Sequence, residues 1–94
     1  MSRPLADESV FRAVAHATRR RMLDYLRNGE RPVSELVGML RLSRPSISQH
    51  LRILRTSGLL QTRRRGRGRM YRIDASRLRA IHQWIIAYEK LWTR

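Results

Sequence analysis

One stretch of the chain, from Leu36 to Ile73, contains no Asp or Glu but ten of the twenty arginines. The same stretch carries apolar residues at the spacing of a packed helix, among them Ile47, Leu51 and Leu54. A disordered basic tail would lack this apolar pattern. We therefore expect a folded surface with one sign of charge, which attracts a polyanion such as nucleic acid.

Size and composition limit the architecture that can present this surface. The chain has 94 residues, is 41% hydrophobic and carries a formal net charge of +14. We expect a single domain over residues 1–94, with a flexible start at residues 1–7. The absence of cysteine excludes disulfides and thiolate metal sites, and no apolar run approaches the roughly 20 residues that span a bilayer. These observations predict a cytoplasmic protein without a membrane partner.

Helical periodicity covers the first half of the chain. Apolar residues recur at helical spacing over residues 10–15, 18–26 and 34–40, and Asn28 and Gly29 would end the second of these helices. Ser43 is a favourable N-cap for a fourth helix, which is expected to run to about residue 57 and end at Gly58. Its apolar stripe leaves an opposite face of polar and basic side chains.

The second half combines a hairpin with a last helix. Two short strands are expected at residues 59–64 and 69–73, around the turn Arg65-Gly66-Arg67-Gly68. A last helix is expected from about residue 76 to the C-terminus. Its apolar positions are spaced three and four residues apart, as in a helix-packing seam. The predicted fold is thus mainly α with a small β-hairpin wing, in the order of a winged helix-turn-helix.

This order predicts a DNA-binding surface. The major groove is about 12 Å wide and admits one helix, and a basic hairpin can contact phosphates or the adjacent minor groove. On the fourth helix we expect base or phosphate contacts from Ser43, Arg44, Ser46, Ser48 and Gln49, with Arg52 and Arg55 as phosphate anchors. On the wing we expect phosphate contacts from Arg63, Arg64, Arg65, Arg67 and Arg69. The alternative for the serines is that Ser43 only caps the helix while Ser46 and Ser48 are only solvated.

The chain resembles the ArsR family of bacterial winged-helix repressors over about residues 10–92. The motifs that carry the resemblance are Phe11-Arg12-Ala13-Val14-Ala15-His16-Ala17-Thr18-Arg19, Val33-Ser34-Glu35-Leu36, Leu42-Ser43-Arg44-Pro45-Ser46-Ile47-Ser48-Gln49-His50-Leu51-Arg52-Ile53-Leu54, Gly58-Leu59-Leu60 and Tyr71-Arg72-Ile73-Asp74. The resemblance implies a homodimer joined through the first and last helices, which binds an imperfect palindrome in a promoter and represses it. The residues expected at the dimer interface are Val10, Phe11, Val14, Leu78, Ile81, Ile85, Tyr88 and Trp92.

The chain departs from the metal-sensing members of that family. Where soft-metal sensors carry a Cys-x-Cys pair, this chain carries Pro32 and Ser34, and its last helix offers only His82 and Glu89 as ligands. We therefore expect no metal and no cofactor, as in the cysteine-free branch of the family. The aromatic residues of the last helix are expected in the core or the dimer contact. The alternative is that they line a cavity for an unknown small-molecule inducer.

The composition and motifs also bear on two other functions. A non-specific nucleic-acid-binding or chromosome-organising protein would show the same charge, and would bind all duplexes equally. An enzyme is not indicated, because the sequence shows no Ser-His-acid grouping, no glycine-rich phosphate loop and no paired carboxylates. His50, at the edge of an apolar face, is expected to be a packed, hydrogen-bonded histidine, not a catalytic base.

Overall fold

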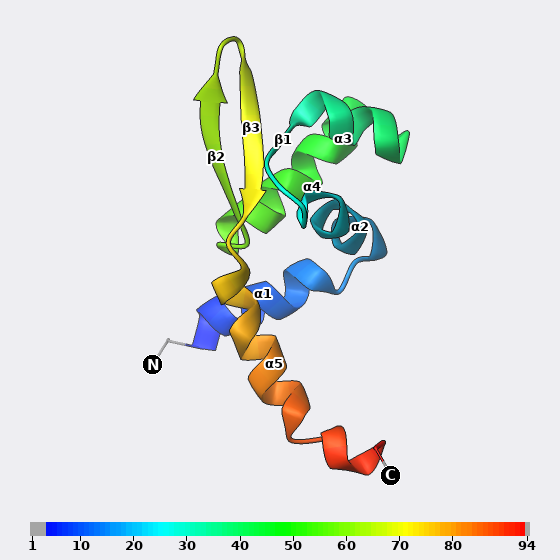
Figure 1. Cartoon of the computed structure of the whole chain (residues 1–94), viewed down its shortest axis with the longest axis vertical. Helices are drawn as coiled ribbons and strands as arrows, with labels where there is room; N and C mark the ends of the chain where they lie inside the picture. Colours follow the sequence, from blue (N-terminus) through cyan, green and yellow to red (C-terminus); the bar gives the residue numbers. More distant parts are fainter. Residues whose placement is uncertain (1–3, 94) are drawn as a thin grey trace.

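The computed structural model describes residues 4–93 as a helical body with a projecting hairpin (Figure 1). The body contains α1 (Pro4–Val14), α2 (Ala17–Leu26), α3 (Val33–Leu40) and α4 (Arg44–Thr56). The hairpin stands at one end, and α5 (Arg79–Ile86) extends away from the body at the other. The predicted winged helix-turn-helix architecture is confirmed.

The core lies where the helices meet the base of the hairpin. Ile47, Leu51 and Leu54 of α4 are almost completely buried, as the apolar stripe of this helix predicts. The largest side chains without solvent access are Met22, Leu26, Leu36, Ile47, Leu54, Leu59 and Leu60. Because the stripe of α4 faces this core, the polar side of α4 faces solvent.

Local signals set both ends of α4. The Ser43 hydroxyl accepts a hydrogen bond from the Ser46 N–H at 3.2 Å, which confirms Ser43 as the N-cap. The helix ends at Thr56, and Gly58 follows with a positive φ of 87°. A Cβ atom here would lie 2.7 Å from Nε of the flexible Arg77 side chain, which can move away, so the positive φ is what favours glycine at this position.

The sheet contains a strand that the sequence did not predict. β1 (Arg31–Pro32), β2 (Leu60–Arg65) and β3 (Gly68–Ile73) form an antiparallel sheet in the order β1-β3-β2. At residues 31 and 32 we expected only a loop leading into the short third helix. Two residues, one of them a proline, show no strand pattern in the sequence. Pairing of Arg31 with Tyr71 and of Pro32 with Met70 creates this edge strand.

The expectation of one continuous last helix is wrong. The segment divides into the 3-10 turn η1 (Ala75–Leu78), α5, and the 3-10 turn η2 (Glu89–Leu91). Asp74 begins it by accepting a hydrogen bond from the Ser76 N–H. Beyond Ile86 the apolar side chains are exposed, with Leu91 74% and Trp92 60% accessible. Helices owe most of their stability to tertiary packing, and this segment has little of it within one chain.

At the opposite end of the chain, α1 already begins at Pro4. We expected residues 1–7 to be flexible; residues 1–3 lie outside the described part of the chain.

Candidate nucleic-acid interface

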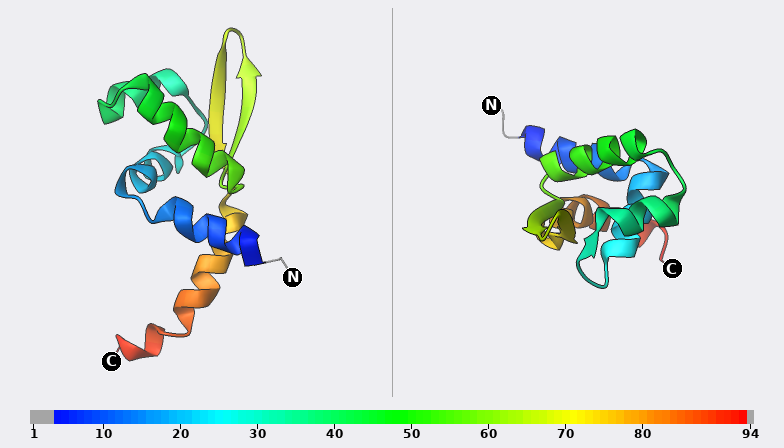
Figure 2. Two further views of the ribbon diagram at one scale, coloured as in Figure 1. Left: turned by 180° about the vertical axis from the view of Figure 1, so that it is seen from behind. Right: turned by 90° about the horizontal axis from the view of Figure 1, so that it is seen from above.

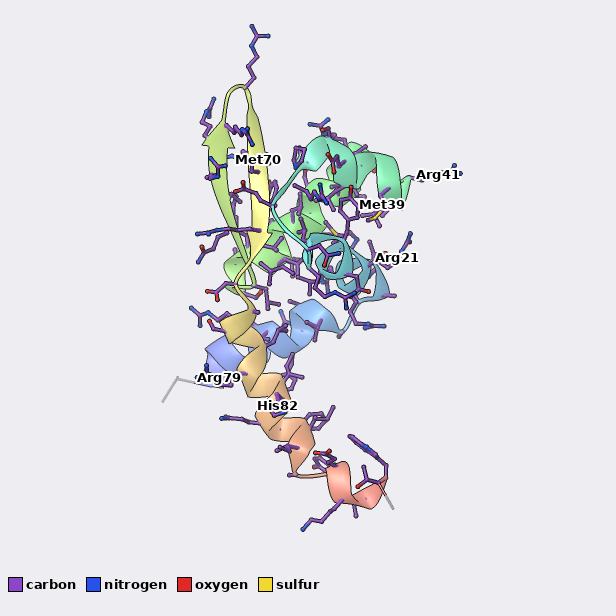
Figure 3. The ribbon with its side chains drawn as sticks, in the orientation of Figure 1. Arg21, Met39, Arg41, Met70, Arg79 and His82 are labelled. Carbon is purple, nitrogen blue, oxygen red and sulfur yellow. The ribbon has the colours of Figure 1, made fainter. Side chains whose placement is uncertain are left out.

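The acid-free stretch forms one end of the molecule. α4 contacts β2, and in Figure 2 both lie at the end opposite to α5. The outward face of α4 and the projecting hairpin therefore belong to one basic surface. Figure 3 shows side chains ending in nitrogen along the hairpin, and Arg41 reaching outward from the end of α3. Arg41 was not among the expected contacts, although it belongs to the same stretch.

The expected contact residues of α4 lie on its solvent side, with one exception. Ser46 is half-buried, whereas Ser43, Arg44, Ser48, Gln49, Arg52 and Arg55 are exposed. Ser43 uses its hydroxyl oxygen as the helix cap, so only the hydroxyl proton remains to donate to a phosphate.

The exposed face of α4 is hollowed at its centre. Gln49, Arg52, Ile53 and Thr56 line a shallow cavity of about 310 Å³. Gln49 can form hydrogen bonds with an adenine edge, and Arg52 with a guanine edge. The partly buried Ile53 offers an apolar surface of the kind that contacts thymine methyl groups. Ile53 and Thr56 were not among the expected contacts.

The wing is an exposed, strongly basic hairpin. Arg63, Arg64, Arg65, Arg67 and Arg69 are all exposed. Gly66 adopts a φ of 61° in the turn, as expected for a glycine at the tip of a hairpin. In the register of the two strands, Arg64 lies opposite Arg69. Like charges in this position repel each other, so an external anion would relieve the repulsion.

One wing arginine is already paired with an acid. Glu30, in the turn before β1, accepts two hydrogen bonds from Arg63, at 2.7 Å from Nε and 2.8 Å from Nη2. The pairing raises the pKa of Arg63 and lowers the pKa of Glu30 below its usual range. Arg63 therefore connects the wing to the segment before β1. Glu30 balances its charge, so Arg63 is less available to a phosphate than we expected. No local signal links two residues 33 positions apart.

His50 has the packed, hydrogen-bonded environment that we expected. The half-buried ring lies with Nδ1 3.2 Å from Arg19 Nη1, and its centroid is 4.7 Å from that of His16. Burial, followed by the nearby His16 and Arg19, lowers the pKa of His50 below its usual value. The lowered pKa favours the neutral ring, whose Nδ1 can accept a hydrogen bond from the Arg19 N–H.

The residues expected at a dimer interface divide into two groups. Val10 is only 2% exposed and belongs to the core of its own chain, while Phe11, Val14, Leu78 and Ile81 are half-buried. Ile85, Tyr88 and Trp92 are exposed. The Trp84 ring packs edge-on against Phe11 at 5.7 Å and lies 5.3 Å from Tyr88.

One cavity lies away from the aromatic residues of the last helix. It measures about 650 Å³, opens between α2, β3 and η1, and includes Leu23, Leu26 and Leu78 in its lining. Among the side chains described, those of residues 8–93, no three from His, Asp or Glu gather in a metal-binding group. No helix within residues 4–93 combines the length and apolarity needed to cross a bilayer.

The chain is similar in sequence and structure to known proteins. The family described as "Bacterial regulatory protein, arsR family" matches residues 16–62, which include α2 to α4 and the start of β2. The HTH-type transcriptional regulator Rv2034 of Mycobacterium tuberculosis is 35% identical over 94 residues, covering 100% of this chain and 85% of the relative. The chain belongs to the ArsR family.

Further comparisons agree with this assignment. The transcriptional repressor SdpR of Bacillus subtilis is 30% identical over 85% of this chain and 89% of its own length. A crystal structure of an ArsR-family transcriptional regulator superimposes with a TM-score of 0.83 at 32% identity, covering 95% of this chain and 92% of the other. This ArsR-family protein is a DNA-binding transcriptional regulator, and its relatives are regulators, not enzymes.

We expect Gln49 and Arg67 to act differently on DNA binding. Gln49→Ala should lower affinity for a cognate duplex while leaving affinity for a scrambled duplex unchanged, because the amide can read a base edge. Arg67→Ala should weaken binding to both duplexes and reduce the salt slope by about one, because it removes a phosphate contact. Fluorescence anisotropy across a salt series measures both effects. Equal loss on the two duplexes for Gln49→Ala would contradict its role as a base reader.

We expect Glu30→Gln to increase binding to scrambled DNA. The substitution removes a negative charge and frees Arg63 to contact a phosphate, so the salt dependence of binding should become steeper by about one counterion. Glu35→Gln is the matched control, because it removes the same charge from a carboxylate that accepts a hydrogen bond from Tyr25 and lies 3.9 Å from Arg31 Nε, so it releases no arginine of the hairpin. If both variants bind scrambled DNA equally, the pairing of Glu30 with Arg63 does not restrain the wing.

Proposed function

We propose that this ArsR-family regulator is a homodimer that binds an imperfect palindrome in a promoter and represses transcription. The observation that carries the proposal is an exposed apolar face on α5 and η2. Trp84, Ile86, Tyr88, Leu91 and Trp92 are between 46% and 74% accessible. Monomers rarely expose so many large apolar side chains on one short segment, whereas dimer interfaces bury such side chains.

The position of this face suits a symmetric dimer. It lies at the end of the molecule away from the wing, so a second copy can join there without covering the basic surface. A two-fold axis through the joined faces repeats α4 in the partner, and the DNA half-sites must then show the same symmetry. Recognition helices of such dimers enter successive major grooves about 34 Å apart.

Repression is the simpler outcome of such binding. A dimer across two successive grooves occupies promoter DNA and excludes polymerase by its presence alone, whereas activation needs an additional favourable contact with polymerase. SdpR of Bacillus subtilis is named as a repressor. HlyU of Vibrio cholerae, which is 33% identical over 77% of this chain, is named as an activator.

The decisive experiment compares the DNA upstream of the protein's own gene with a scrambled duplex of equal length. A sequence-specific regulator should bind the upstream DNA at least about 10³-fold more tightly at physiological salt, with two chains per site. Anisotropy titration at several salt concentrations gives the affinities, and sedimentation gives the stoichiometry. Equal binding that falls steeply with salt would favour a non-specific, chromosome-organising protein instead.

We expect Leu91→Glu to break the dimer. A charge in the centre of an apolar interface loses its hydration without gaining a partner, which opposes association strongly. Sedimentation equilibrium should show a monomer, and tryptophan emission should shift to longer wavelength, because both tryptophans of the chain lie on this face. Gln83→Glu, at an exposed position on α5, is the control and should remain dimeric. A dimeric Leu91→Glu would place the interface elsewhere.

A further inference from the structure

Arg19 is a charged residue almost completely enclosed by protein. Only 8% of it is accessible, and its burial lowers its pKa. Arginine is rarely buried to this extent unless its guanidinium group is fully occupied by hydrogen bonds. The bonds that it makes therefore indicate what it holds in place.

Two of these bonds end on α1. Arg19 Nε donates to the Ala13 carbonyl oxygen at 2.7 Å, and Nη2 donates to the Arg12 carbonyl oxygen at 3.2 Å. Both carbonyls belong to the last turn of α1, where backbone acceptors lack partners within the helix. The positive guanidinium also lies at the negative, C-terminal end of the α1 dipole, which is a favourable electrostatic interaction. Arg19 thus caps α1 from the first turn of α2.

The third bond reaches the recognition helix. Arg19 Nη1 lies 3.2 Å from Nδ1 of His50, in the middle of α4 and next to Gln49. His16 packs against the same ring and is itself fixed as the N-cap of α2, where its Nδ1 accepts from the Thr18 N–H. One planar group therefore connects the end of α1 to the centre of α4, with the start of α2 between them.

On its other side, α1 contacts the last helix. Phe11 packs edge-on against Trp84 of α5, with ring centroids 5.7 Å apart. Contacts therefore run without a break from α5 through Phe11 and α1 to Arg19 and α4.

We propose that Arg19 is a positioning residue that fixes the recognition helix relative to α1 and so connects the dimer face with DNA reading. The second half of this statement rests on the proposed homodimer. Lysine cannot replace arginine here, because an ammonium group lacks the rigid fork that reaches three acceptors in one plane. DNA reading should therefore depend on the guanidinium, not on the positive charge alone.

Arg20 provides a matched control. Its Nη1 donates to the Val14 carbonyl oxygen at 2.8 Å, so it caps the same end of α1 from an exposed position. Arg20→Lys changes the same side chain in the same way at the adjacent residue. Arg20→Lys therefore controls for the loss of a guanidinium that caps α1 without contacting His50.

The test compares these variants in two measurements. Arg19→Lys should lower the ratio of upstream to scrambled DNA affinity about tenfold, while binding to scrambled DNA stays within about twofold. Without DNA, amide hydrogen exchange of residues 44–56 should quicken about tenfold relative to residues 17–26. Arg20→Lys should change neither quantity, and all chains should have the wild-type mass in sedimentation.

A second variant keeps the proposal testable if Arg19→Lys does not fold. His50→Leu removes the acceptor on α4 and leaves both bonds to α1, and it should give the same two effects. Unchanged exchange in residues 44–56 for both variants, or equal changes in Arg20→Lys, would overturn the proposal. If the wild-type protein does not prefer its upstream DNA, the proposed function fails, and the exchange measurement still decides the role of Arg19.

Discussion

The burial of one apolar stripe on α4 determines what this protein presents to DNA. Ile47, Leu51 and Leu54 are between 0% and 3% exposed. Full burial of such side chains stabilises a fold by about 1.5–3 kcal/mol each, so rotation of the helix about its axis would lose several of these contributions at once. The orientation of Gln49 and Arg52 toward solvent is thus a consequence of packing on the opposite side of the helix.

The basic surface that results is unfavourable for the isolated chain. Ten arginines follow one another without an acid between Leu36 and Ile73, and Arg64 lies opposite Arg69 in the wing. The hairpin projects into solvent, where water and salt screen this repulsion, and Glu30 balances Arg63 at its base. A DNA backbone supplies the remaining counter-charges and releases its own counterions, which favours binding. The same charges that oppose compactness therefore favour association with DNA.

The two surfaces that need a partner lie at opposite ends of the molecule. The basic surface carries charge without counter-charge, and the end of α5 exposes tryptophan, tyrosine and leucine side chains. Between them, α1 packs against α5 through Phe11 and Trp84, while Arg19 bonds its last turn to α4. A domain of this size buries a limited share of its surface, so its few long-range contacts carry much of its internal order.

Elements with local causes could be predicted from the amino-acid sequence. Apolar periodicity predicted α4, the Ser43 hydroxyl set its start, and the glycines at 58 and 66 marked a helix end and a hairpin turn, because only a few neighbouring residues decide these features. The basic character of the site also followed directly from composition. The tertiary structure alone decided the edge strand β1, the pairing of Glu30 with Arg63 and the bond from Arg19 to His50. These depend on residues about thirty or more positions apart, whose approach no short pattern encodes. The end of α5 was likewise decided by the tertiary structure. The apolar spacing of this segment shows which residues can pack, but the segment stays helical only where they do pack.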